Sequence, residues 1–150
     1  MLKGISPLIS PELLKCLCEM GHGDEIVLAD AHFPAMNLGP KVIRADGLDI
    51  PRLLEAILQL IPLDQYDANH FALMQVVPGD PVDPVIWKDY ADILIKAEPD
   101  TTPTFVERFA YYQRAAKAYC IVATGEQAQY ANVILKKGVV KGYITDNIKT

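Results

Sequence analysis

Short runs of apolar residues alternate along this chain with segments whose apolar residues recur at helical spacing. The runs without polar alternation cover residues 25–30, 71–77 and 119–125. A strand with this pattern is buried on both faces, which is typical of a parallel sheet rather than a half-exposed antiparallel one. The alternation predicts an α/β fold with three layers, in which helices cover both faces of a largely parallel central sheet.

The segments between these runs predict four helices and two further strands. Helices are expected over residues 12–20, 51–61, 85–97 and 109–118, and additional strands over 41–46 and 133–140. Ser10 and Asp49, each followed by a proline within two positions, suit the start of a helix. Residues 104–108 are ambiguous, because Thr104 and Glu107 fit a capping box whereas the β-branched and aromatic residues favour a strand.

Length and charge narrow the classes of protein to consider. The 150 residues are enough for one domain with a real core, which we place at residues 1–150. The net charge of −5, without a block of basic residues, argues against nucleic acid or an anionic membrane as partner. The prolines at positions 7 and 11 interrupt the N-terminal segment, so no signal peptide is expected, and no segment has the length of a transmembrane helix.

The three cysteines favour a reducing compartment. An odd number without a secretion signal indicates free thiols in the cytoplasm. Cys16 and Cys18 are two positions apart in a predicted helix and point in different directions, so they form no zinc pattern. We interpret them as small buried side chains.

Ionisable residues gather at both ends of the first apolar run, in "MGHGDEIVLADAHFP". His22 lies between two glycines after a helix, where it either interacts with the helix C-terminus or serves as a general acid/base near neutral pH. Asp30 closes the strand, where it either caps the next turn or contributes to a site at the strand end. The spacing of His22, Asp30 and His32 matches no metal-binding motif, and we expect no metal site.

A second group of candidate residues lies in the second half of the chain. Tyr130 and Asn132 precede the last strand and are either turn residues or a hydroxyl and an amide that face a cleft. Arg108 is either a surface charge or a donor to sugar oxygens, and His70 is interpreted as a surface loop residue. The glycine-rich phosphate-binding motifs are absent from the sequence, which disfavours a nucleotide site.

Four segments together resemble a known family. They are "SPELLKCLCEMGHGDEIVLADAHFPA", "VIRADGL", "ERFAYYQRAAKAY" and "TGEQAQYANVILKKGV". This combination resembles the L-fucose mutarotases, which share a family with D-ribose pyranase, over about residues 1–140. Arg108 favours the fucose branch, because the pyranase branch usually has histidine there. The tail over residues 140–150 matches no motif, and no role is assigned to it.

The resemblance implies an enzyme without a cofactor that interconverts the α and β anomers of a sugar. It places the acid/base group on His22 and substrate binding on Asp30, Arg108, Tyr130, Ala131 and Asn132. It also implies a homo-oligomer, decameric in some members, with sites between subunits. Fucose mutarotases often have glycine at the position of Ala131, so the expected contact there is through the backbone.

The distance along the first strand bears on this assignment. Eight residues at ~3.3 Å each would separate His22 from Asp30 by up to ~26 Å, more than a pyranose can span. Either residues 21–24 fold back along the strand, or two subunits share the site. The alternatives are a D-ribose pyranase, a non-catalytic sugar-binding protein that does not need His22, and, more remotely, a metal-dependent hydrolase.

Overall fold

Six strands form one sheet in the computed structural model, which describes residues 1–142. Their order is β2-β5-β1-β6-β3-β4. β6 runs antiparallel to both of its neighbours, β1 and β3, whereas the other three pairs are parallel. The strands are β1 (Glu25–Ala29), β2 (Lys41–Ala45), β3 (Phe71–Met74), β4 (Thr104–Val106), β5 (Cys120–Thr124) and β6 (Val133–Lys136).

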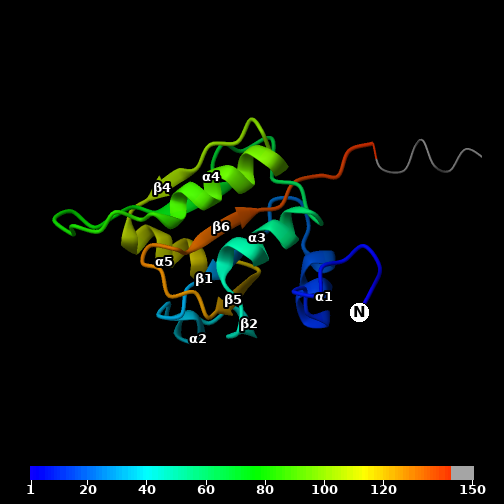
Figure 1. The fold of residues 1–150 in the computed structure, drawn as a ribbon, viewed down its shortest axis with the longest axis horizontal. Coiled ribbons are helices and arrows are strands. Elements are labelled where there is room, and N and C mark those ends of the chain that lie inside the picture. Colours follow the sequence, from blue (N-terminus) through cyan, green and yellow to red (C-terminus); the bar gives the residue numbers. More distant parts are fainter. Residues whose placement is uncertain (143–150) are drawn as a thin grey trace, which may run out of the picture.

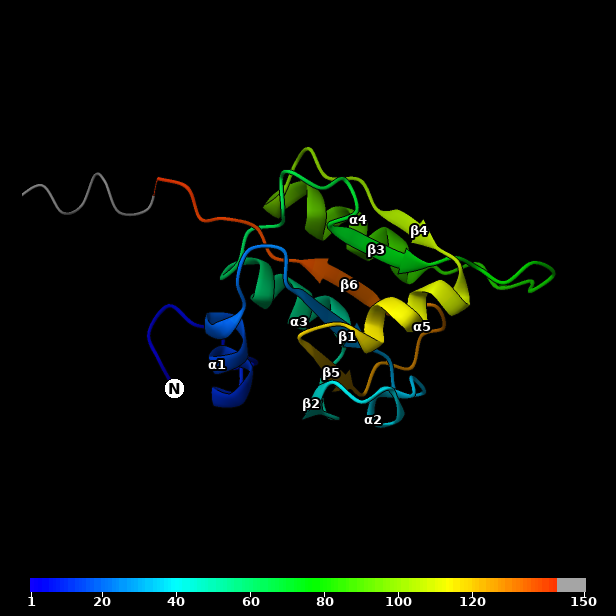
Figure 2. The same ribbon diagram turned by 180° about the vertical axis from the view of Figure 1, so that it is seen from behind.

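Helices cover both faces of this sheet, as the sequence predicts. α3 and α4 lie in front of the sheet in Figure 1, and α5 lies in front of it in the reverse view of Figure 2. Residues of α1, α3 and α4 share one hydrophobic core, and residues of α2 and α5 share the other. The helices are α1 (Pro11–Glu19), α2 (Ala35–Leu38), α3 (Ile50–Leu58), α4 (Ile86–Ala97) and α5 (Arg108–Ala116).

β1 shows why an unalternating apolar run belongs in the middle of this fold. Ile26 and Leu28 face the core on the α1, α3 and α4 side, whereas Val27 and Ala29 face the core on the α2 and α5 side. All four side chains are completely buried. Successive strand residues point to opposite faces, so a strand covered on both sides needs apolar residues at every position.

The structure corrects several predicted boundaries. The last strand ends at Lys136 instead of residue 140, and β3 ends at Met74 instead of residue 77. The ambiguity over residues 104–108 is resolved in favour of a strand: Thr104 belongs to β4, and its hydroxyl donates to the Phe71 carbonyl. Glu107 is itself the N-cap of α5, because its carboxylate accepts from the backbone N–H groups of Phe109 and Ala110.

The two cysteines of α1 differ in burial, and helical geometry explains the difference. Cys16 is buried against Cys120, with the two sulfur atoms 2.7 Å apart where α1 meets β5. The expectation that Cys18 is buried too is wrong, since its side chain is exposed. Two positions along a helix turn a side chain by about 200°, so Cys16 and Cys18 cannot face the same core.

No helix within residues 1–142 combines the length and the apolar character that crossing a membrane requires.

Candidate functional site

A cavity of about 520 Å³ opens at one edge of the sheet. It lies where β1 and β3 end, where α5 follows β4, and where the chain approaches β6. The antiparallel direction of β6 explains this meeting, because residues that precede β6 lie at the same edge as residues that follow β1 and β3. The lining residues are Asp30, His32, Phe33, Met74, Val77, Asp80, Arg108, Tyr112, Ala128, Gln129, Tyr130 and Asn132.

Asp30 and Asn132, which both line this cavity, are joined by a hydrogen bond. The Asn132 side-chain oxygen accepts a hydrogen bond of 2.7 Å from the backbone N–H of Asp30. Since this bond fixes the amide, its nitrogen is the group left to donate to a ligand. The Asp30 carboxylate accepts from the His32 N–H at 2.9 Å, and burial raises the pKa of Asp30 above its ordinary value.

Tyr130 adopts a backbone conformation that is unusual for a residue other than glycine, with φ of 55°. Three contacts hold it there. Its hydroxyl donates to Asp80 at 2.5 Å and accepts from the Val77 N–H at 3.2 Å, and its carbonyl accepts from the Trp87 indole at 2.8 Å. The hydrogen bond to Asp80 also raises the pKa of Tyr130. The phenol therefore stays protonated near neutral pH and is a poor base.

These bonds also attach a projecting segment to the cavity. Residues 75–85, called the arm here, follow β3 and extend beyond the end of the sheet in Figure 1. Val77 and Asp80 belong to the arm, and both line the cavity. Tyr130 thus joins the arm to the loop that precedes β6. Val77 and Asp80 cannot be recognised as site residues from the sequence, because an exposed "PGDP" turn carries no signal of its tertiary partner.

Ala131, unlike Tyr130 and Asn132 on either side of it, does not line the cavity. Its side chain is completely buried in the core. Its carbonyl accepts a hydrogen bond of 2.5 Å from the Tyr90 hydroxyl. Ala131 therefore positions Tyr130 and Asn132, and any contact it makes with a ligand must come from the backbone.

Arg108 begins α5 at the rim of the cavity. Its guanidinium lies 5.5 Å from the ring centre of Phe109 and 5.7 Å from that of Tyr112, distances at which a cation interacts with an aromatic face. Arg108 is exposed, so it is accessible to a ligand as a donor. Four predicted site residues thus surround one cavity: Asp30, Arg108, Tyr130 and Asn132.

His22, the predicted acid/base residue, does not line this cavity. The loop before β1 still pairs with the chain that follows β6, at the end of β1 opposite to Asp30. The Gly23 N–H donates to the Lys137 carbonyl and the Lys137 N–H donates to the Asp24 carbonyl, both at 2.9 Å. Residues 21–24 therefore do not fold back along the strand. α1, which precedes His22, and the arm lie at opposite ends of the molecule in both Figure 1 and Figure 2.

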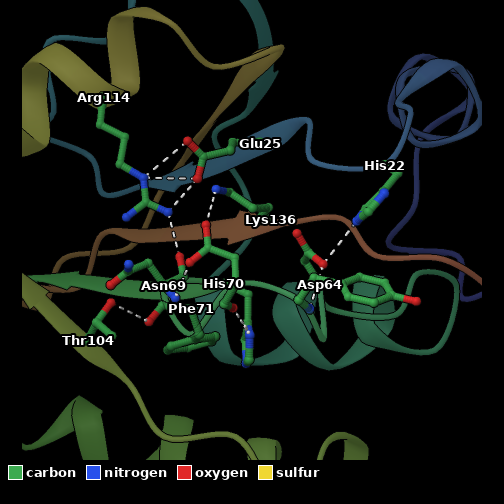
Figure 3. Close-up of polar contacts among 11 residues, drawn as sticks. His22, Glu25, Asp64, Asn69, His70, Phe71, Thr104, Arg114 and Lys136 are labelled. Atoms are coloured by element: carbon green, nitrogen blue, oxygen red, sulfur yellow. Dashed lines mark hydrogen bonds and ion pairs between the residues drawn. The ribbon is translucent and has the colours of Figure 1, made fainter.

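Other ionisable groups at the His22 end of the sheet have structural partners, several of which Figure 3 shows. Asp24 accepts from the Gly21 N–H at 2.7 Å. Glu25 pairs with Arg114 of α5, which also donates to the Asn69 carbonyl at 2.6 Å. His70 lies in the loop before β3, as expected, but it is half-buried and both of its ring nitrogens are hydrogen-bonded.

Among residues 1–142, no three histidine, cysteine, aspartate or glutamate side chains come together in a way that could hold a metal ion. The chemistry that the described groups offer is hydrogen bonding to a polar ligand and proton transfer at histidine. A cavity of this size lies in the range of small-molecule sites. The cavity is surrounded by a carboxylate, a guanidinium, a phenol and an amide. These groups suit a ligand with several hydroxyl groups.

Comparison with known proteins agrees with this description. Residues 3–140 match the RbsD / FucU transport protein family, and the chain belongs to that family. It is similar to the fucose mutarotase of Streptococcus pneumoniae, whose structure was solved in complex with L-fucose. The two are 53% identical over 93% of this chain and 99% of that one, with a TM-score of 0.89.

Two other solved structures share the fold. FucU from Bifidobacterium longum is 49% identical over 92% of this chain and 99% of its own, with a TM-score of 0.89. RbsD from Bacillus subtilis, solved with D-ribose, covers 93% of this chain and 99% of its own with a TM-score of 0.70, but only 22% of the residues are identical. The likeness to RbsD is therefore one of fold.

Proposed function

We propose that this protein is an L-fucose mutarotase, which interconverts the α and β anomers of the sugar by opening and closing the pyranose ring. The observation that carries the proposal is the cavity lined by Asp30, Arg108, Tyr130 and Asn132, in a chain 53% identical to a fucose mutarotase solved with L-fucose. The much lower identity to RbsD, at 22%, favours fucose over ribose as substrate.

The reaction moves protons but transfers no electrons. The proton leaves O1, the C1–O5 bond breaks so that C1 becomes an aldehyde, and the ring oxygen takes up the proton. After rotation about C1–C2 the ring closes on the other face, the ring oxygen gives up its proton and O1 regains it. One histidine can carry the proton between O1 and the ring oxygen near pH 7, and we assign this role to His22.

The remaining residues hold the sugar. In this proposal Asp30 accepts from a hydroxyl, Arg108 and the Asn132 amide donate to sugar oxygens, and Tyr130 offers its hydroxyl. Ala131 takes part through its backbone. The Tyr130 hydroxyl already donates its proton to Asp80, so in this proposal it serves as a hydrogen-bonding group and His22 transfers the proton.

We further propose that two subunits form each site. His22 and the cavity lie at opposite edges of one sheet, so His22 reaches a bound sugar only when a neighbouring subunit supplies it. This requires a homo-oligomer in which one edge of each subunit meets the other edge of the next, and a ring such as a decamer satisfies that geometry. We place the protein in the cytoplasm, as a single-domain enzyme that works without a cofactor.

Saturation-transfer NMR on equilibrated L-fucose tests the activity directly. Irradiating one anomeric proton should reduce the signal of the other anomer only when the protein is present. Repeating the measurement with D-ribose ranks the two branches of the family. Binding of L-fucose without transfer of saturation would instead indicate a sugar-binding protein and would overturn the proposal.

A further inference from the structure

Asp80 is a second carboxylate at the cavity that Asp30 lines. It belongs to the arm, lines the cavity and is exposed. None of the ion pairs within residues 1–142 includes Asp80, so its charge has no cationic partner in the described part of the chain. The proposed function assigns Asp30 to a sugar hydroxyl and leaves this second carboxylate without a contact to the sugar.

The turn of the arm fixes the direction of the Asp80 carboxylate. The Asp80 N–H donates to the Val77 carbonyl at 3.0 Å, and Gly79 has a φ of 88°, which glycine adopts without strain. Oδ1 of Asp80 accepts from the Val82 N–H at 3.2 Å, and Oδ2 accepts from the Tyr130 hydroxyl at 2.5 Å. Both oxygens are thus held before a ligand binds, which lowers the entropic cost of binding.

The number of acceptor sites shows what Asp80 can still offer a ligand. A carboxylate that is ionised at neutral pH has about four lone-pair sites and no donor. Asp80 uses one site for Val82 and one for Tyr130, so about half of its acceptor capacity remains. Only hydrogen-bond donors can fill these sites, and the donors of a sugar are its hydroxyl groups.

The neighbouring groups of the cavity do not supply this capacity. The Tyr130 hydroxyl donates to Asp80 and accepts from the Val77 N–H, so it is already in use both as a donor and as an acceptor. Arg108 can only donate. A bound sugar needs acceptors for its hydroxyl protons as well as donors for its oxygens, and Asp80 is an accessible acceptor with a full charge.

We propose that Asp80 is a substrate-binding residue, whose carboxylate accepts a hydrogen bond from a hydroxyl of L-fucose. This role rests on the proposed function, and it makes the arm, which extends beyond the sheet in Figure 1, one wall of the sugar site. It also makes Asp80 a determinant of specificity. A sugar without a hydroxyl at that place leaves the carboxylate without its donor and binds more weakly.

Titration calorimetry with L-fucose measures the contribution of Asp80. We expect Asp80→Ala to raise Kd by roughly tenfold or more, the usual effect of losing a hydrogen bond to a charged group. Asp80→Asn keeps an acceptor oxygen without the charge, so its Kd should rise less. Asp83→Asn is the matched control and should keep the natural Kd, because Asp83 is exposed in the same arm and is not among the cavity-lining residues. A natural Kd in Asp80→Ala would overturn the proposal.

A double-mutant cycle with Tyr130→Phe separates direct binding from an effect that acts through Tyr130. Tyr130→Phe removes the hydroxyl that Asp80 holds. If the Asp80 carboxylate contacts the sugar, Asp80→Ala should raise Kd in the Tyr130→Phe background as well. If Asp80 only orients Tyr130, the second substitution should change nothing, and that result would overturn the direct contact.

Deoxy analogues of L-fucose, each of which lacks one hydroxyl, test the same contact from the side of the ligand. For one analogue, the loss of affinity relative to L-fucose should be much smaller in Asp80→Ala than in the natural protein. The missing donor and the missing acceptor belong to the same hydrogen bond, so their effects are not additive. Each protein serves as its own reference, so a change in stability does not affect the comparison. Equal losses in both proteins for every analogue would contradict the proposal.

The outcomes distinguish this inference from the proposed function. Natural protein that binds L-fucose, with the expected loss in Asp80→Ala but without saturation transfer, would refute the mutarotase proposal and leave Asp80 as a binding residue. Saturation transfer together with an unchanged Kd in Asp80→Ala would refute the role of Asp80 alone. Natural protein that does not bind L-fucose would refute both.

Discussion

At the scale of the residue, His22 distinguishes an enzyme from a sugar-binding protein. We expect His22→Ala to lower the rate of anomer exchange by about 10²–10⁴-fold, because the variant loses its proton-transfer group. Binding of L-fucose should persist, because Asp30, Arg108 and Asn132 still surround the cavity. Saturation transfer measures the rate, and titration calorimetry measures binding. An unchanged exchange rate would contradict the assignment.

A second prediction concerns Asp67 and the dependence of the protein's stability on pH. Its ion pair with Lys136 lowers the pKa of Asp67 to about 2. A carboxyl whose pKa is lower in the folded state stabilises the protein above its unfolded pKa of about 3.9, and this contribution is lost as the pH falls toward 2. We therefore expect Asp67→Asn to be less stable than the natural protein at pH 5, with the difference shrinking by about pH 3.

Urea denaturation of both proteins at the two pH values measures the free energies of unfolding. Asp92→Asn is a suitable control, because Asp92 is exposed and makes no hydrogen bond with the described residues. A difference between the natural protein and Asp67→Asn that stays constant with pH would show that the ion pair does not matter.

At the scale of the element, Gly138 lies two residues beyond the end of β6 and packs against the loop before β3. A side-chain carbon at this position would lie 2.4 Å from the Leu63 carbonyl oxygen, so only glycine lets the chain pass so close to the loop before β3. We expect Gly138→Ala to lower the free energy of unfolding by about 1–3 kcal/mol, because backbone has to move. Gly47→Ala is the control, since that position is open and should change stability by less than about 0.5 kcal/mol.

Thermal and urea denaturation check both glycine variants. Because Gly138 packs against Leu63 and the adjacent Asp64, the alanine variant should also disturb the hydrogen bond between Asp64 and His22. Equal stabilities of the two variants would mean that the loop moves aside without cost.

At the scale of the whole molecule, the opposite positions of His22 and Asn132 predict complementation between subunits. His22→Ala and Asn132→Ala should each be nearly inactive as pure proteins. When both chains are produced together with different tags and mixed oligomers are isolated, random assembly should combine His22 of one chain with Asn132 of its neighbour in about a quarter of the sites. Saturation transfer should then reappear. Mixed oligomers that remain inactive, or a fully active monomer, would contradict a shared site.

The sequence alone determined the layers of the fold and four of the residues around the cavity, Asp30, Arg108, Tyr130 and Asn132. Apolar runs such as residues 26–29 can only be satisfied in a sheet covered on both faces, because neighbouring side chains point to opposite sides. Prolines, caps and periodicity placed α1, α3, α4 and α5 to within a few residues, whereas the short helix α2 was not predicted. Resemblance to a family, rather than spacing, selected Arg108, Tyr130 and Asn132.

Only the tertiary structure decided which of these residues meet. The antiparallel course of β6 brings Asn132 to Asp30 and leaves His22 with Asp64 at the other edge, and no local pattern specifies the direction of a strand in a sheet. Tyr130 contacts Asp80, and Gly138 contacts Leu63. Both contacts join residues distant in sequence, which local secondary-structure propensity cannot encode. The sequence therefore supplied the chemical groups, and the packing of the sheet assigned them to its two edges.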